Sequence, residues 1–213
     1  EILNSSQLSP DYKNIIIDNY MKLKYSDLEI QDKEYLMFLI FDYYSFFKDY
    51  KRIKELSLYP ADSEIRGLFL LVGDYYSSIP GKSSAEIKKI TAAYLERLND
   101  LQNTGGSNAI KLRAKELMAD IFYAEKKVDA AVKLYDEIQY SPESTGNLTA
   151  AAIYKKAFIY KELKQSSAFL KIMREILSRY SDNKLYVNSA LNAIVDYYSE
   201  HNRDDKKIDI TDY

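Results

Sequence analysis

The stretch 114–138 constrains the fold of this chain more than any other part of it. It reads AKELMADIFYAEKKVDAAVKLYDEI, and its apolar residues recur at helical spacing on both sides of a polar break at Lys126-Lys127. This pattern predicts two short amphipathic helices joined by a tight turn. Small residues let two helix backbones approach, and larger apolar ones fill the space beside them. The positions expected at this interface are Ala119, Phe122, Val128, Ala131 and Tyr135.

The same pattern returns 38 residues later in the chain. The pair Ala157 and Tyr160 corresponds to Ala119 and Phe122. The copy departs from the first hairpin at Phe169, where a small residue is expected. A constant offset of this length predicts an array of similar helical hairpins. Further residues at the same offset are Ile121, Val132, Leu134 and Ile138, matched by Ile159, Leu170, Ile172 and Ile176.

Residues 109–199, which hold these hairpins, resemble the tetratricopeptide repeat (TPR) family, whose unit is a helix–turn–helix of about 34 residues. The resemblance implies an all-α fold, a right-handed α-α superhelix of TPR-like helical hairpins, built as a single array over residues 1–213. Residues 10–102 are expected to form N-terminal helices and degenerate hairpins. Residues 109–199 are expected to form the clearest hairpins plus a capping helix, and residues 200–213 a polar tail.

Apolar periodicity, caps and breaks set the expected bounds of the other helices. Asp32 is expected to cap the second helix. The link 103–108 contains Gly105-Gly106 and is expected to separate two halves of the chain, either as a hinge or as a plain linker. One face of the first helix is expected to hold Tyr12, Ile16, Tyr20 and Leu23. The expected helices are 10–24, 33–47, 63–77, 85–102, 149–163, 166–180 and 185–199. A further short helix is expected through Tyr50, Ile53 and Leu56, ended by Tyr59-Pro60.

The helix 33–47 is apolar on nearly all sides, which predicts that other helices cover most of it. Its aromatics allow two interpretations, core packing or an exposed binding surface. We expect a mixture, in which most pack inside and a few face a groove. The hairpin spacing recurs here with larger residues at Phe41, Tyr44, Tyr50 and Ile53.

The composition and the few chemically reactive residues of the chain bear on whether it could bind nucleic acid, hold a metal or catalyse a reaction. There are 30 Lys+Arg and 32 Asp+Glu, so the net charge of −2 gives no basis for general nucleic-acid binding. The chain has no Cys, and its one histidine, His201, stands in the polar tail without a nucleophile beside it. Acidic residues near Asp204 and Asp209 are expected to be a solvated tail rather than a Ca²⁺ site. Gly105-Gly106 lacks the Lys-Ser/Thr of a phosphate loop. We therefore expect no enzyme activity, no cofactor and no metal.

The helix junctions carry a second pattern, in which an aromatic ends one helix, a turn follows and Ser or Asn precedes the next. The three junctions start at Tyr59, Tyr140 and Tyr180. They resemble those of TPR proteins of the bacterial cell envelope, which implies a periplasmic or envelope-associated location; a cytoplasmic location is the alternative. No apolar run is long enough to span a bilayer. Because the chain opens with Glu1 rather than Met, a leader or anchor could have been removed.

The TPR resemblance also implies a binding surface. In stacked hairpins the first helix of each pair lines the concave side, which places Asp42 there together with eight residues of two later hairpins. Ordinary solvated side chains are the alternative interpretation. The family's clamp for a C-terminal carboxylate uses Lys and Asn, but Glu116 and Asp120 stand at these sites, so no clamp is expected. The expected partner-binding residues are Arg113, Glu116, Asp120, Tyr123, Tyr154, Lys155, Phe158 and Lys161.

These features favour a protein–protein interaction scaffold in a bacterial cell-envelope complex, with a protein or peptide as the partner in the concave groove. A regulatory module that binds a peptide or a small ligand is the first alternative. A purely structural helical domain of a larger chain is the second.

Overall fold

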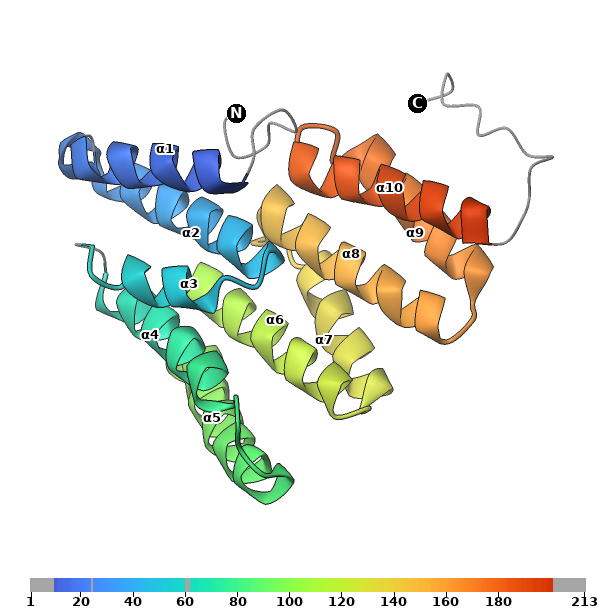
Figure 1. Ribbon diagram of the computed structural model, residues 1–213, viewed down its shortest axis with the longest axis horizontal. Coiled ribbons are helices and arrows are strands. Elements are labelled where there is room, and N and C mark those ends of the chain that lie inside the picture. The colour runs from blue at the N-terminus through green and yellow to red at the C-terminus, as the bar shows by residue number, and fades with distance from the viewer. Residues whose placement is uncertain (1–9, 24, 60–61, 201–213) are drawn as a thin grey trace.

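The computed structural model describes residues 10–23, 25–59 and 62–200 (Figure 1). This part of the chain is all-α and contains no strand, which confirms the predicted all-α class. The helices are α1 (Pro10–Leu23), η2 (Tyr25–Asp27), α2 (Ile30–Phe46), α3 (Tyr50–Leu56), α4 (Ser63–Ser78), α5 (Ser84–Thr104), α6 (Asn108–Ala124), α7 (Val128–Gln139), α8 (Gly146–Glu162), α9 (Ser166–Arg179) and α10 (Lys184–Glu200).

Side-chain caps start several of these helices where the sequence offers Ser, Thr or Asp. Ser83 caps the start of α5 through a capping box with Glu86. Ser107 and Thr145 accept backbone N–H bonds at the starts of α6 and α8. The cap predicted at Asp32 is wrong, because α2 already begins at Ile30 and Asp32 lies within its first turn.

Three hairpins, α2–α3, α6–α7 and α8–α9, share one backbone turn. Lys48, Lys126 and Lys164 each follow the first helix of a pair in the left-handed conformation, with φ of 57°, 63° and 58°. In each, the lysine N–H and the next N–H bond to carbonyls of the helix end, as Asp49 N–H does to the Tyr44 carbonyl at 2.9 Å. This is the Schellman geometry that ends helices. The turns thus show a structural repeat within the chain.

The buried face of α1 differs from the predicted stripe. Ile17 and Met21 are buried, whereas Tyr20 is exposed and Ile16 is only half-buried. The side chains of Tyr12 and Leu23 lie outside the described part of the structure. Rotation of α1 by about one residue relative to the expected face explains the difference, because the neighbouring position turns by roughly 100° in a helix.

The glycine link after α5 does not divide the core. A single apolar cluster runs from Ile17 in α1 through Leu98 in α5 to Ile121 in α6. The N–H of Gly106 donates to both carboxylate oxygens of Glu64 in α4, at 3.0 and 2.8 Å. The expectation that this link separates two halves is therefore wrong, since α6 packs with the helices before it.

Phe169 fills the place where the repeat pattern calls for a small residue. Its side chain is fully buried, and its ring lies 6.0 Å from that of Phe158 and 5.6 Å from that of Tyr197. The core of the last three helices is therefore built around an aromatic ring, while Ala131 at the equivalent position of the previous hairpin is fully buried as a small residue.

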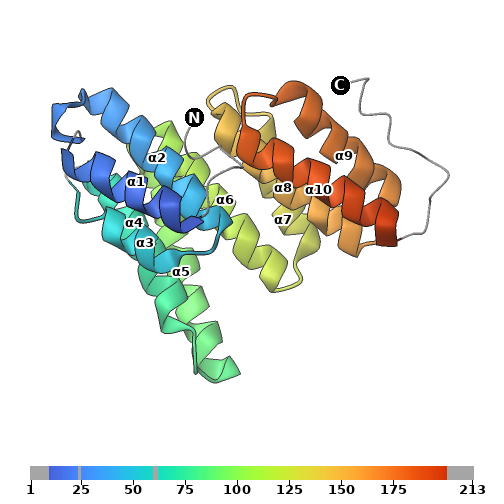
Figure 2. The same ribbon diagram turned by 45° about the horizontal axis from the view of Figure 1, so that its top comes forward.

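The helices are arranged so that α2 lies beside α6 and α8, while α4 and α5 extend away from the rest of the molecule (Figures 1 and 2). Helix α8 contacts both α2 and α10, so the N-terminal helices reach the C-terminal hairpins.

The aromatic side chains of α2 include both buried and exposed ones, as expected. Phe41, Tyr43 and Tyr44 are buried, whereas Tyr35 and Phe47 are exposed.

Candidate functional site

A central cavity of about 510 Å³ lies where α2, α4, α6, α8 and α10 meet. Pockets for small ligands commonly have volumes of about 300–1,000 Å³ and are mostly apolar with a few convergent polar groups. Nine of the residues that line this cavity are aromatic, and five more are charged. The exposed Lys48, at the turn between α2 and α3, marks where the cavity reaches solvent.

Aromatic rings from three helices form one wall of the cavity. The Tyr154 ring of α8 lies 6.0 Å from Phe46 of α2, 5.0 Å from Phe158 and 5.5 Å from Tyr186 of α10. On the other side, Tyr50 and Tyr76 stack with ring centroids 3.6 Å apart. Rings held by contacts with one another form a preformed apolar surface.

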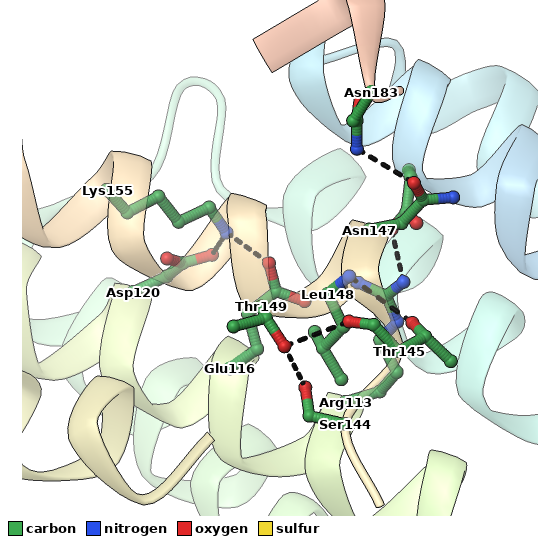
Figure 3. Close-up of polar contacts among 11 residues, drawn as sticks. Arg113, Glu116, Asp120, Ser144, Thr145, Asn147, Leu148, Thr149, Lys155 and Asn183 are labelled. Atoms are coloured by element: carbon green, nitrogen blue, oxygen red, sulfur yellow. Dashed lines mark hydrogen bonds and ion pairs between the residues drawn. The ribbon is translucent and has the colours of Figure 1, made fainter. Parts of the chain in front are cut away.

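A cluster of charged side chains forms another wall. The Lys155 ammonium of α8 donates to Asp120 at 2.7 Å and to Glu116 at 2.9 Å, so it bridges two carboxylates of α6 (Figure 3). The Tyr135 hydroxyl donates to the other oxygen of Asp120 at 2.5 Å. Asp120 and Lys155 are partly exposed, with side-chain exposures of 24% and 31%, because they face the cavity.

Arg113 extends this cluster into the interior. Its guanidinium contacts Glu116 at 2.8 Å and Asp42 of α2 at 2.5 Å. All three side chains are buried. Arg113 also lies 5.6 Å from the centroid of the Phe41 ring. The pair with Asp42 fixes α2 against α6, so the charged wall is held in place by three helices.

The environment shifts the pKa values of these groups in different directions. Burial raises the pKa of Asp42 to about 6, although Arg113 opposes the shift. Burial also raises the pKa of Asp120. Burial acts in the same direction on Glu116, but Lys155 and Arg113 together outweigh it and lower the pKa of that carboxyl. Burial disfavours the charged form of Lys155, but Asp120 and Glu116 overcome this and raise its pKa. Glu116 and Lys155 thus stay charged at neutral pH.

Six of the eight residues expected at a concave binding surface line this cavity together. They are Glu116, Asp120, Tyr123, Tyr154, Lys155 and Phe158. Arg113 lies behind the carboxylates and is buried, which makes it a structural residue and corrects its placement on an open surface. Lys161 also lies outside the lining, 3.2 Å from Glu200 of α10.

Helix α2 explains this correction. The TPR resemblance implies an open groove at these residues. In the structure α2 contacts α8, its Asp42 pairs with Arg113 of α6, and side chains of α2 line part of a cavity instead. Sequence reasoning missed the contributions of Phe46, Tyr50, Tyr76 and Tyr186. The only signal for Tyr76 and Tyr186 would have been their position late in α4 and early in α10, which does not reveal that both point to one space.

Comparison of the chain with protein-family models, with curated proteins and with solved structures finds no match. No helix among residues 10–23, 25–59 and 62–200 is long and apolar enough to cross a membrane.

Proposed function

We propose that this protein is a protein–protein interaction module that receives a segment of a partner protein in its central cavity. We further propose that its hairpins form a TPR-like right-handed superhelix. The three equivalent Schellman turns at Lys48, Lys126 and Lys164 support that arrangement.

The observation that carries this proposal is a preformed aromatic cavity with charged groups fixed at its wall. Hot spots of protein interfaces are enriched in aromatic residues that sit in well-packed, desolvated pockets. Tyr154 and Phe158 have this environment, since both rings are half-buried, lie 5.0 Å apart in a tilted arrangement and line the cavity. A rigid site also lowers the entropy lost on binding.

We propose binding without catalysis. The carboxylates that face the cavity are each engaged by a cation, Asp42 by Arg113 and Asp120 by Lys155. A general base or nucleophile needs a proton-accepting group aimed at a substrate. Carboxylates held in fixed ion pairs suit a structural and electrostatic role better than a catalytic one.

A small-ligand-binding module is the second candidate. The specific observation in its favour is the cavity volume of about 510 Å³, which suits a compact ligand as well as a few side chains.

The location we propose is the bacterial cell envelope, and it rests on the resemblance of the junctions at Tyr59, Tyr140 and Tyr180 to those of envelope TPR proteins.

The test compares capture of partners by three forms of the full chain. The cavity form carries Tyr154→Ala with Phe158→Ala, and the matched control carries Tyr35→Ala with Leu58→Ala, two apolar residues exposed by 62% and 81%. A partner retained by wild type and control but lost from the cavity form supports the proposal. Calorimetry with the identified partner should then show a loss of about 2 kcal/mol or more.

Two outcomes would contradict the proposal. A partner that the cavity form still binds with wild-type affinity would place the interface elsewhere on the molecule. If no form captures a partner, the interaction role falls and a purely structural domain becomes the better description. Because alanine at both sites could unfold the protein, Tyr154→Leu with Phe158→Leu serves as a second form that conserves more of the apolar volume.

A further inference from the structure

We propose that the central cavity binds a basic side chain of the partner, a lysine or an arginine. Its alkyl stem packs against the aromatic wall and its charged head reaches the carboxylates of Asp42, Glu116 and Asp120. This inference rests on the proposed function and adds the chemical group that the cavity receives.

The charges of the cavity wall carry this inference. The cluster of ion pairs joins three carboxylates, Asp42, Glu116 and Asp120, to the two cations of Arg113 and Lys155. It therefore carries one excess negative charge when every member is ionised. All three carboxylates line the cavity, but of the two cations only Lys155 does. A negative charge buried without a partner is costly, so a cation that enters the cavity gains by neutralising it.

The exposure of Lys48 and the raised pKa values of Asp42 and Asp120 are consistent with this charge balance. Lys48 also lines the cavity, but it is exposed at the mouth, where water screens its charge. Burial raises the pKa of Asp42 to about 6 and also raises the pKa of Asp120, so the surroundings of both carboxyl groups disfavour their negative charge. An anionic ligand would add to that charge, whereas a basic group would relieve it.

The aromatic lining suits a side chain with an apolar stem and a cationic head. Ring faces attract ammonium and guanidinium groups within about 6 Å. The protein already contains one such arrangement, because the Arg113 guanidinium lies 5.7 Å from the Phe38 ring and 5.6 Å from the Phe41 ring while it pairs with Asp42 and Glu116. Tyr154, Phe158 and Tyr76 can supply the same contacts inside the cavity.

An organic cation fits better than a metal ion. In the part of the chain that the structure describes, no group of three potential metal ligands is close enough to hold an ion. Lys155 lies between Asp120 and Glu116, at 2.7 and 2.9 Å, in the position that a metal would need. A longer side chain can instead extend along the cavity and leave the Lys155 bridge intact.

The test uses three capped peptides of sequence Ala-Leu-X-Leu-Ala, with lysine, norleucine or glutamate at X. Titrations of the full chain are followed by NMR. Because norleucine keeps the stem but lacks the charge, the lysine peptide should bind about tenfold more tightly than the norleucine peptide. This preference should disappear in Asp120→Asn and persist in the matched control Asp100→Asn, whose residue is exposed on α5. The comparison of peptides on the unaltered protein does not depend on how the variants fold.

Each other outcome overturns the inference in a recognisable way. Equal or tighter binding of the norleucine peptide would make the ligand apolar, and tighter binding of the glutamate peptide would make Lys155 the recognition group. If n-butylammonium chloride binds as tightly as the lysine peptide, the cavity serves a free amine rather than a partner's side chain. Absence of binding by every probe would reject a basic anchor. The capture experiment tests whether the protein binds a partner, and the peptide titrations test which chemical group enters the cavity. A negative result in the titrations therefore leaves the proposed interaction role standing.

Discussion

The Arg113 guanidinium of α6 lies 2.5 Å from a carboxylate oxygen of Asp42 in α2. Both side chains are buried, with exposures of 4% and 7%, so this ion pair connects the N-terminal helices to the hairpins inside the protein. The same guanidinium contacts Glu116, which Lys155 bridges to Asp120. The wall of the cavity and the packing of α2 therefore depend on one cluster.

Replacement of Arg113 tests this dependence. Arg113→Leu leaves the buried carboxylates of Asp42 and Glu116 with Lys155 as the one cation of the cluster, and loss of one partner of a buried pair costs about 3–5 kcal/mol. We expect the free energy of unfolding in urea to fall by that amount. Arg97→Leu, at an exposed position on α5, should change it by no more than about 0.5 kcal/mol. A similar small effect for Arg113→Leu would mean that the cluster does not hold the helices together.

The stability contributed by Asp42 should depend on pH. Its pKa rises from 3.8 to about 6 on folding, so between these values the folded protein binds more protons than the unfolded chain. Stability from this group is therefore full below about pH 4 and is lost as the pH rises through about 6, a change on the order of 3 kcal/mol. Urea unfolding of wild type and Asp42→Asn at pH 4, 5, 6 and 7 should show wild type losing stability relative to the variant. Parallel curves would show that the carboxyl is ionised across this range.

Close packing of α3 against α4 should make Gly73 intolerant of a side chain. An added Cβ would lie 2.4 Å from the Cβ and 3.0 Å from the Cα of Lys54, so the helices would have to separate. Gly73→Ala should lower the free energy of unfolding by about 1–3 kcal/mol. Gly67 in the same helix has no atom within 4 Å of an added Cβ, and Gly67→Ala should raise stability by about 0.5–1 kcal/mol. Equal effects of the two substitutions would contradict the close approach.

The small residue at the α6–α7 interface should not accept a larger one. Ala131 is fully buried, and Ala131→Leu should overpack its site and cost about 1–3 kcal/mol. Ala93→Leu, at an exposed position in the middle of α5, is the matched substitution and should leave the thermal midpoint nearly unchanged. An unchanged midpoint for Ala131→Leu would mean that the hairpin register is wrong.

The left-handed lysines of the hairpin turns should favour glycine. Lys164 has φ of 58°, a conformation that costs a residue with a Cβ about 1–2 kcal/mol, so Lys164→Gly should raise stability by up to about 1 kcal/mol. Lys171→Gly, at an exposed position inside α9, should instead lower stability by about 1 kcal/mol. Thermal unfolding of the two variants should thus shift in opposite directions, and a shared direction would contradict the role of the turn.

Periodicity and turn chemistry predicted the helices because both act over a few neighbouring residues. The short helix predicted through Tyr50, Ile53 and Leu56 is α3, which ends at Leu56, before the predicted stop at Tyr59-Pro60. The predicted helix 63–77 differs from α4 by one residue. The helix 149–163 begins three residues early in the structure, because Thr145 rather than a later residue accepts the capping hydrogen bond from Leu148. The pairing of Ala119 and Ala131 as small interface residues is confirmed, since both are fully buried.

The sequence by itself determined the helical class and most helix bounds to within three residues, because these follow from local spacing within each helix. The resemblance to TPR hairpins, rather than spacing alone, led to seven of the residues that line the cavity, Asp42 among them. Only the tertiary structure decided that side chains of α2 line the cavity, that Arg113 is buried against Asp42, and that Tyr76 and Tyr186 face the same space. These contacts join residues far apart in the chain, and no periodic pattern encodes which distant helix covers a given face. The angle and order in which whole helices pack, rather than the preference of any single segment, set the charge and shape of the cavity.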